Sequence, residues 1–325
     1  MTVPRPAPRA DPDAPPGEPL TLTAADGYAL AGTRYAAAPG APRAHLVVAG
    51  ATGVPQGFYR RFAAHAAGRG FATLTLDYRG IGRSAPASLR GFRVDYRDWA
   101  RLDLAAAVTV AGAAAVRDGV PLVLVGHSYG GHALGLLPDP GPIAAAYLFA
   151  TGAGWHGWMP PLERVRVLGL WRVLGPALVR WKGYLPWSLL GMGEDLPLGV
   201  YRQWRRWCAY PHYFFDDPSV GDEMRSLFAR VRAPIVAANA TDDAWAPPRS
   251  RDAFMAGYRN APWRAVDVDP AAPGSPPGVG PVGHVPIGHM GYFRPHAARL
   301  WDEALAWLAA PRASDAPGAA AAAGP

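Results

Sequence analysis

The sequence predicts an α/β fold, in which a mostly parallel central sheet carries helices on both faces. Short apolar runs that suit buried strands alternate with segments of helical periodicity through the first half of the chain, and this alternation is typical of parallel sheets. The alternation stops after residue 151 and returns after residue 218, which predicts a helical insertion. A glycine-flanked serine motif, at residues 126–131, follows directly on one of the apolar runs.

Local patterns predict each element of this fold in turn. Residues 20–35 alternate apolar and polar positions around a glycine, which predicts an early hairpin. Apolar runs predict buried strands at residues 45–50, 71–76, 121–125, 143–149, 233–238 and 263–268. Helical spacing predicts helices at residues 58–68, 96–116, 133–137, 162–179, 250–258 and 295–308. The Gly175-Pro176 pair should kink or end its helix, because proline lacks an N–H donor.

The domain organisation follows from the composition and from the alternation of predicted strands and helices. We expect a disordered Pro-rich N-terminus at residues 1–19 and a disordered Ala/Gly/Pro tail at residues 311–325. The core should comprise residues 20–151 and 219–310. The helical insertion, residues 152–218, contains seven of the twelve tryptophans and has the position of a lid. The alternative is a helical decoration whose tryptophans pack into its own core.

Composition limits the classes of partner and compartment. The formal charge is +7, but the basic residues are spread along the chain, so no nucleic-acid surface is predicted. Cys208 is the single cysteine, which excludes an intrachain disulfide. The N-terminus does not resemble a signal peptide and no stretch resembles a clean membrane span. We therefore expect a cytoplasmic protein that needs neither a cofactor nor a metal.

The Gly-His-Ser-Tyr-Gly-Gly motif at residues 126–131 makes Ser128 the candidate nucleophile. A serine hydroxyl must project from the backbone and needs a base to remove its proton. A sharp strand-to-helix turn supplies the projection, and Gly126 and Gly130 leave room for neighbouring chain. The strand pattern before the motif and the helix pattern after it favour this interpretation over an ordinary tight turn.

The base should be a histidine late in the chain. His289 lies in a loop after the last predicted strand and before the final helix, a position that brings the ring up to the serine. His284 is the rival in the same loop. His296 falls inside the predicted final helix, where a solvated residue is the simpler interpretation.

A carboxylate after a strand, between the serine and the histidine, should orient the imidazole. Asp243 is favoured and Asp242 is the alternative, and the order serine, aspartate, histidine is that of the α/β-hydrolases. Two backbone N–H groups should hold the oxyanion. One is that of Tyr129, and the other is that of Ala51 or Thr52, in the loop after residues 45–50.

From about residue 20 to residue 310 the chain resembles the α/β-hydrolases. It is most similar to a bacterial subgroup of predicted serine hydrolases near the serine aminopeptidase and monoacylglycerol lipase-like branch. The matching segments are residues 51–55 with Tyr59, 77–84, 126–131, 241–243 and 287–294. The resemblance implies Ser128 as nucleophile, Asp243 as acid, His289 as base and a lid over the insertion. Many relatives begin the oxyanion loop with His-Gly, where this chain has Ala49-Gly50.

These residues predict hydrolysis of a carboxylic ester, or of an amide, through an acyl-enzyme. The alternatives are an acyltransferase with the same triad and a non-catalytic ligand-binding protein of the same fold. The tryptophan-rich insertion favours a small-molecule ester with an apolar acyl or aromatic group. Membrane association is a further alternative, although a solvated face is the favoured interpretation of the insertion's basic residues Arg164, Arg166, Arg172, Arg180 and Lys182.

Overall fold

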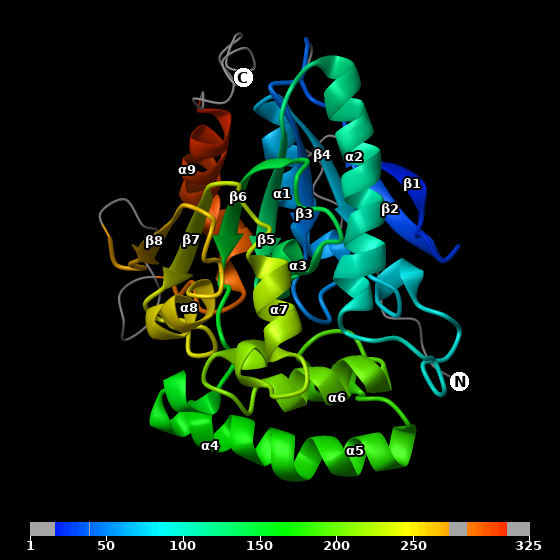
Figure 1. Ribbon diagram of the computed structural model, residues 1–325, viewed down its shortest axis with the longest axis vertical. Coiled ribbons are helices and arrows are strands. Elements are labelled where there is room, and N and C mark those ends of the chain that lie inside the picture. The colour runs from blue at the N-terminus through cyan, green and yellow to red at the C-terminus, as the bar shows by residue number, and fades with distance from the viewer. Residues whose placement is uncertain (1–16, 39, 273–284, 311–325) are drawn as a thin grey trace, which may run out of the picture.

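A computed structural model describes residues 17–38, 40–272 and 285–310. Its centre is one eight-stranded sheet with the order β1-β2-β4-β3-β5-β6-β7-β8 (Figure 1). The β1–β2 and β2–β4 pairs are antiparallel and all the others are parallel, so the predicted mostly parallel sheet is confirmed. The strands are β1 (Glu18–Thr23), β2 (Ala29–Tyr35), β3 (Ala44–Ala49), β4 (Phe71–Leu76), β5 (Leu122–His127), β6 (Ile143–Phe149), β7 (Ile235–Ala240) and β8 (Trp263–Val268).

The central strands are buried and mostly apolar because helices cover both faces of the sheet. Along β5, Leu122 and Leu124 face one hydrophobic cluster, whereas Val123 and Val125 face the other. This alternation follows from the two-residue period of a strand. Such continuous apolar runs are what made the strands predictable.

Two sets of helices form these layers. Helices α1 (Arg60–Gly68) and α9 (Ala298–Ala309) contribute to one hydrophobic cluster, and α2 (Ala105–Asp118), α3 (Tyr129–Leu136), α7 (Gly221–Phe228) and α8 (Pro248–Met255) contribute to the other. Short 3-10 turns occupy Gln56–Tyr59, Gly82–Ser84, His156–Trp158, Trp187–Leu190, Tyr213–Asp216, Gly291–Phe293 and Pro295–Ala297.

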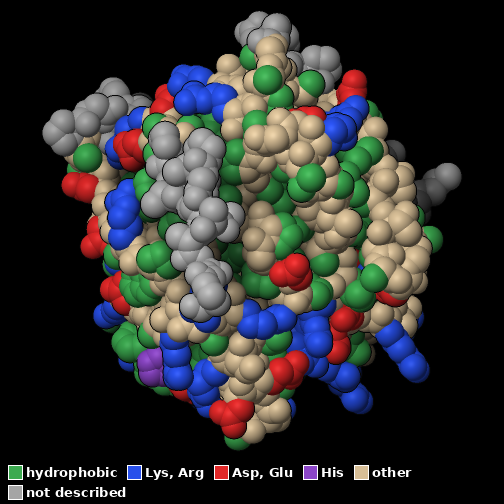
Figure 2. Space-filling view, turned by 45° about the horizontal axis from the view of Figure 1, so that its top comes forward, with side chains coloured by type: hydrophobic (Ala, Val, Ile, Leu, Met, Phe, Trp, Pro, Cys, Tyr) green, Lys and Arg blue, Asp and Glu red, His purple; other side chains and the backbone are tan. Residues whose placement is uncertain are grey.

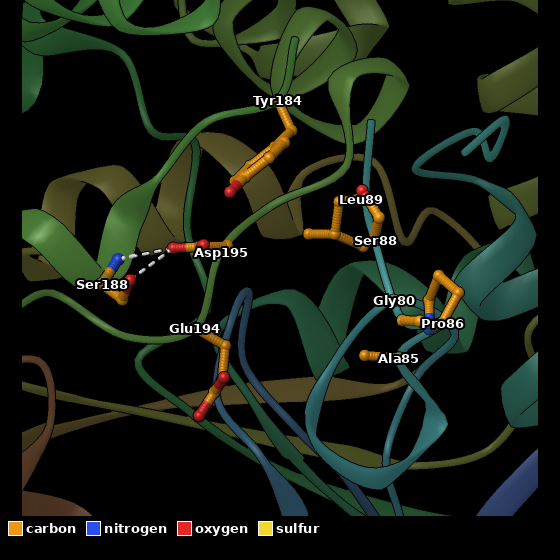
Figure 3. Close-up of a pocket in the computed structure, with 10 residues that line it drawn as sticks. Gly80, Ala85, Pro86, Ser88, Leu89, Tyr184, Ser188, Glu194 and Asp195 are labelled. Atoms are coloured by element: carbon orange, nitrogen blue, oxygen red, sulfur yellow. Dashed lines mark hydrogen bonds between the residues drawn. The ribbon is translucent and has the colours of Figure 1, made fainter. Parts of the chain in front are cut away.

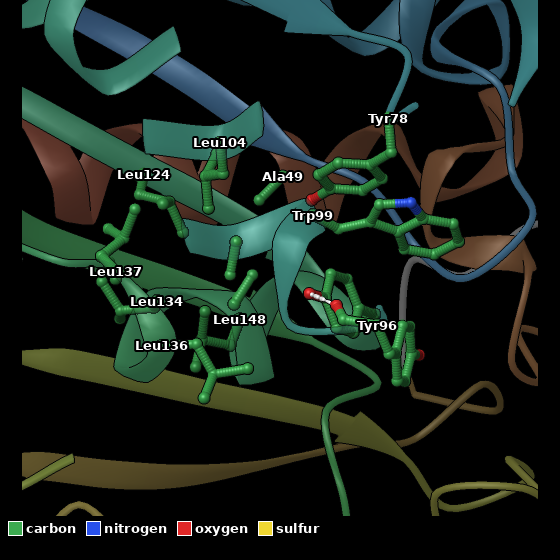
Figure 4. Packing of buried hydrophobic residues seen from close by; sticks show 14 of the residues in the cluster. Ala49, Tyr78, Tyr96, Trp99, Leu104, Leu124, Leu134, Leu136, Leu137 and Leu148 are labelled. Atoms are coloured by element: carbon green, nitrogen blue, oxygen red, sulfur yellow. Dashed lines mark hydrogen bonds between the residues drawn. The ribbon is translucent and has the colours of Figure 1, made fainter. Parts of the chain in front are cut away.

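A π-helical segment, Trp99–Leu104, leads into α2. By length and composition alone, the combined helix Trp99–Asp118 could cross a membrane. Here Trp99 is fully buried and stacks on Tyr78 at 5.1 Å between ring centroids. Figure 4 shows this aromatic group beside the leucines of β5 and α3. The helix is therefore apolar because it packs on the sheet.

The insertion forms the layer of helices at the bottom of Figure 1. It contains α4 (Pro161–Gly169), α5 (Gly175–Lys182) and α6 (Leu198–Trp207). The predicted stop at Gly175-Pro176 is wrong, because a π-helical turn, Leu170–Leu174, carries α4 on into α5. The predicted kink stays a prediction. Pro176 is the second residue of α5 and has no N–H to donate, so the change from π-helical to α-helical geometry occurs where one backbone hydrogen bond is missing.

The predicted N-terminal boundary needs a small correction. Strand β1 begins at Glu18 and pairs with Arg34 of β2, so two residues of the segment predicted as disordered belong to the sheet. The expected C-terminal tail, residues 311–325, lies outside the described residues.

Candidate active site

Ser128 stands at the turn between β5 and α3 with φ 52° and ψ −106°. A non-glycine residue rarely adopts a positive φ, and its persistence here means that the surrounding structure holds it. The Ser128 N–H donates to the Phe149 carbonyl at 2.8 Å, and the Thr151 hydroxyl donates to the Ser128 carbonyl at 3.0 Å. The turn is therefore fixed on both sides by β6 and the residues that follow it.

Two glycines allow this turn to sit close to its neighbours, as the motif predicted. A Cβ on Gly130 would lie 2.1 Å from the Ala49 carbonyl oxygen, and one on Gly126 would lie 2.7 Å from a methyl group of Leu148. Neither distance is compatible with a side chain. Helix α3 can therefore start directly against the end of β3, where the loop with the second predicted oxyanion donor begins.

His289 connects the serine to a carboxylate. Its Nε2 lies 3.0 Å from Ser128 Oγ, and its Nδ1 lies 2.9 Å from Asp243 Oδ2. The Asp243 side chain is fully buried, whereas 21% of the His289 side chain is exposed. Asp243 Oδ1 also accepts the N–H groups of Trp245 and Ala246, each at 2.9 Å. The structure thus brings together the serine, histidine and aspartate that the sequence singled out.

The alternative acid and the rival bases have other positions. Asp242 accepts the N–H groups of Ile287 and Gly288 at 3.0 and 2.9 Å, so it fastens the loop that carries His289. His284 lies outside the described residues. His296 occupies a 3-10 turn before α9 rather than the helix itself, and its Nε2 is buried instead of solvated.

The two predicted oxyanion residues of the β3 loop differ in their N–H groups. The Ala51 N–H donates to the Tyr59 hydroxyl at 2.8 Å, so it is already engaged and Ala51 is a poor candidate. No hydrogen bond of the Thr52 N–H occurs within the described part of the chain. The Tyr129 N–H is the first of α3 and has no intrahelical acceptor. Thr52 and Tyr129 therefore remain as the available pair.

Tyr96, which the sequence analysis missed, links these two residues. Its hydroxyl is hydrogen bonded to the Thr52 hydroxyl, and its carbonyl accepts the Tyr129 hydroxyl at 2.7 Å. Its ring also stacks on the Tyr129 ring at 4.3 Å between centroids. Burial raises the pKa of the Tyr96 phenol well above its usual value, so this residue is a neutral clamp.

A second missed connection runs from the oxyanion loop to the histidine loop. The Tyr59 hydroxyl accepts from Ala51, so its proton points to His127 Nδ1, 2.9 Å away, and His127 Nε2–H then donates to the His289 carbonyl at 2.9 Å. Burial, with a smaller contribution from His289, lowers the His127 pKa to about 3. His127 is therefore neutral and can serve as both acceptor and donor. From the sequence, Tyr59 was identified only within a segment that resembles the α/β-hydrolases, without a role of its own.

Aromatic side chains of the insertion approach the site. Trp204 of α6 lies between Trp245, at 6.0 Å, and Tyr96, at 6.5 Å between ring centroids. Trp245 in turn lies 6.2 Å from the His289 ring. Trp204 of the insertion therefore joins Tyr96 and Trp245 in an aromatic surface between the oxyanion loop and the loop that carries Asp243.

A separate cavity of about 260 Å³ lies where the insertion meets the loop after β4 (Figure 3). Its walls include Gly80, Leu89, Tyr184, Glu194 and Asp195. Asp195 faces Ser188, from which it accepts two hydrogen bonds. No residue of the Ser128 site lines this cavity. Within the described ranges, no group of three or more His, Cys, Asp or Glu side chains could hold a metal ion.

Comparisons with known proteins place this chain in a family. The sequence model described as "Serine aminopeptidase, S33" matches residues 40–264. Among solved structures, a soluble variant of monoglyceride lipase from Saccharomyces cerevisiae in complex with a substrate analog has a TM-score of 0.66 at 14% identity, over 94% of this chain and 98% of that chain. The esterase domain of a Rhodothermus marinus protein has a TM-score of 0.53 at 16% identity, over 90% and 98%.

DcsB, determined in complex with its substrate analogue, has a TM-score of 0.54 at 16% identity, over 89% of this chain and 96% of that chain. A search of the curated proteins found no match. The family match covers more than half of the chain, and the likeness to the lipase structure covers 94% of it. The chain belongs to the serine aminopeptidase S33 family and has the fold of the α/β-hydrolases.

Proposed function

We propose that the protein is a serine hydrolase that cleaves a carboxylic ester. The observation that carries the proposal is the continuous array from Ser128 Oγ through His289 to Asp243, with links of 3.0 and 2.9 Å. A serine whose hydroxyl contacts an oriented base is the arrangement that nucleophilic acyl transfer requires. The family and the fold support hydrolase activity.

The reaction begins when Ser128 Oγ attacks the ester carbonyl and His289 Nε2 takes the hydroxyl proton. The carbonyl oxygen becomes an oxyanion, which accepts hydrogen bonds from the N–H groups of Tyr129 and Thr52. The carbon–oxygen bond to the alcohol then breaks, and His289 returns its proton to the leaving oxygen. Water attacks the acyl-enzyme in the same way and releases the acid, which restores Ser128.

Asp243 sets the histidine in the tautomer that this cycle needs. Because its carboxylate accepts from Nδ1–H, the lone pair of Nε2 faces the serine. The carboxylate also stabilises the imidazolium that forms. Two backbone N–H groups and full burial fix its position, so the aspartate supplies charge and orientation without moving.

The aromatic surface supports an apolar acyl or aromatic substrate. Between ring centroids, Trp204 lies 6.0 Å from Trp245 and 6.5 Å from Tyr96, and of these three residues only Trp204 belongs to the insertion. We infer that residues 152–218 act as a lid that contributes one wall of the acyl pocket. Burial of each further CH₂ group on that wall would favour binding by about 0.8 kcal/mol.

A panel of aryl esters with graded acyl chains, together with an aminoacyl anilide, tests the proposal. We expect turnover of the esters, kcat/KM that rises with chain length, and little turnover of the anilide. Ser128→Ala should abolish turnover, whereas Ser226→Ala, at an exposed serine of α7, should leave it unchanged. Ester turnover that survives Ser128→Ala would overturn the proposal. Trp204→Ala should remove the dependence on chain length more than it changes turnover of the shortest ester.

A further inference from the structure

The insertion exposes large hydrophobic side chains on the side away from the sheet. Of the nine such side chains that are exposed in the described residues, seven lie between Leu162 and Met192. The rod formed by α4, the π-helical turn and α5 is the layer farthest from the sheet in Figure 1. A soluble surface rarely concentrates exposed apolar residues in this way without a partner.

The exposed residues of the rod form a stripe. Six apolar residues follow one another at intervals of three or four, which puts them on one side of a helix. All six are exposed, in contrast to the inward-facing Val167, Leu170 and Trp171. We call them the outer stripe: Leu162, Val165, Gly169, Val173, Ala177 and Trp181. Leu162, Val165, Val173 and Trp181 are each between 61 and 70% exposed.

Positive charges flank the outer stripe. The rod carries five basic residues, and its single acidic residue, Glu163, already contacts Trp245 and Arg166. The Lys182 ammonium lies over the Trp181 ring at 4.1 Å from its centroid. Figure 2 shows Lys and Arg side chains gathered along the lower part of its view. The five are Arg164, Arg166, Arg172, Arg180 and Lys182.

We propose that the outer stripe docks the protein on an anionic lipid surface. Apolar side chains in line, with a tryptophan and flanking Lys and Arg residues, suit a helix that lies in the headgroup region of a bilayer. A second copy of the chain fits less well, because a two-fold interface on this rod would bring its cations toward their own copies. Negative headgroups complement the same charges. The inference is independent of the proposed ester hydrolysis.

Flotation with sealed vesicles of phosphatidylcholine containing phosphatidylglycerol, and with phosphatidylcholine alone, tests the proposal on the full chain. We expect the protein to float with the anionic vesicles, less with the neutral ones, and less at high salt because the Debye length shortens. The double variant Val173→Glu with Trp181→Glu should bind at least tenfold more weakly. In the double variant Arg172→Gln with Arg180→Gln, the affinity for the anionic vesicles should fall about fivefold for each charge removed.

Val116→Glu is the matched control, because Val116 is 84% exposed on α2, outside the insertion. It should float like the wild type, as should Ser128→Ala, which separates docking from catalysis. Turnover of a soluble short-chain aryl ester should be unchanged in the stripe variants. Absence of wild-type flotation, or equal losses in the Val116→Glu control, would overturn the proposal. Dimerisation without lipid that the stripe variants abolish would overturn it in favour of self-association.

Discussion

The hydroxyl of Tyr59 offers the sharpest test of how the oxyanion loop is held. Tyr59→Phe removes one oxygen that accepts from the Ala51 N–H and donates to His127 Nδ1. The phenyl ring keeps its packing against Phe293, at 4.8 Å between centroids. The substitution therefore isolates the two hydrogen bonds from any effect of a cavity.

The magnitude follows from the burial of the partners. Tyr59, Ala51 and His127 are 1, 3 and 0% exposed, so water cannot replace the lost oxygen without a rearrangement. Each unsatisfied buried group costs about 1–3 kcal/mol, and two such groups give a loss of about 2–6 kcal/mol in the free energy of unfolding. Because domains are stable by about 5–15 kcal/mol, the variant should still fold.

Urea unfolding followed by tryptophan fluorescence measures this loss, and kcat on an aryl ester measures its consequence for the site. The freed Ala51 N–H should loosen the loop that carries the Thr52 donor, so we expect kcat to fall about tenfold, less than the loss of a whole donor. Tyr28→Phe is the control, because its hydroxyl makes one hydrogen bond, to the Ser84 carbonyl. Tyr28→Phe should lower the free energy of unfolding by about 1 kcal/mol and leave kcat unchanged. A Tyr59→Phe loss below about 0.5 kcal/mol with unchanged kcat would refute the reasoning.

Three further predictions concern charge and packing. Burial lowers the His132 pKa from 6.5 to about 3, so between those pH values the unfolded chain binds a proton that the folded chain does not, and the free energy of unfolding falls as pH falls. His132→Phe should reduce this dependence of the free energy of unfolding on pH by about 1.4 kcal/mol per pH unit. An unchanged pH dependence in urea titrations would contradict this. Gly130→Ala should abolish activity and destabilise the fold because its Cβ would meet a backbone carbonyl oxygen. In the control Gly112→Ala in α2, the nearest atom to the new Cβ is 3.6 Å away, and the variant should be more stable by about 0.5–1 kcal/mol in the same titrations. A tolerated Gly130→Ala would show that the close approach is absent. Asp243→Asn should lower kcat about 10⁴-fold. Asp242→Asn weakens only the contacts with the N–H groups of Ile287 and Gly288 and should lower kcat far less. Equal losses of kcat in steady-state assays would argue against Asp243 as the acid of the triad.

The sequence predicted those features that depend on neighbouring residues. The strand at Leu122–His127 was predictable because β5 is buried on both faces and its first four residues are therefore apolar. Ser128, Asp243 and His289 could be singled out because each follows a predicted strand in a characteristic chain order. The structure adds that these three side chains meet.

Other features depend on contacts that the sequence does not display. The choice between Ala51 and Thr52 depends on the hydroxyl of Tyr59, which accepts the Ala51 N–H, whereas the Thr52 N–H makes no hydrogen bond among the described residues. The clamp by Tyr96 arises where the segment before α2 meets the oxyanion loop. The continuation of the helix through Gly175-Pro176 requires a π-helical turn, which residue propensities disfavour.

The central claim, that Ser128 is an activated nucleophile, is tested most directly by covalent labelling. The wild-type protein would be treated with a fluorophosphonate probe, digested and mapped by mass spectrometry, beside the Ser128→Ala, His289→Ala and Ser226→Ala variants. We predict a single adduct on Ser128, lost in Ser128→Ala, strongly slowed in His289→Ala and unchanged in Ser226→Ala. An unlabelled wild type, or an adduct on another residue that persists in Ser128→Ala, would contradict the claim.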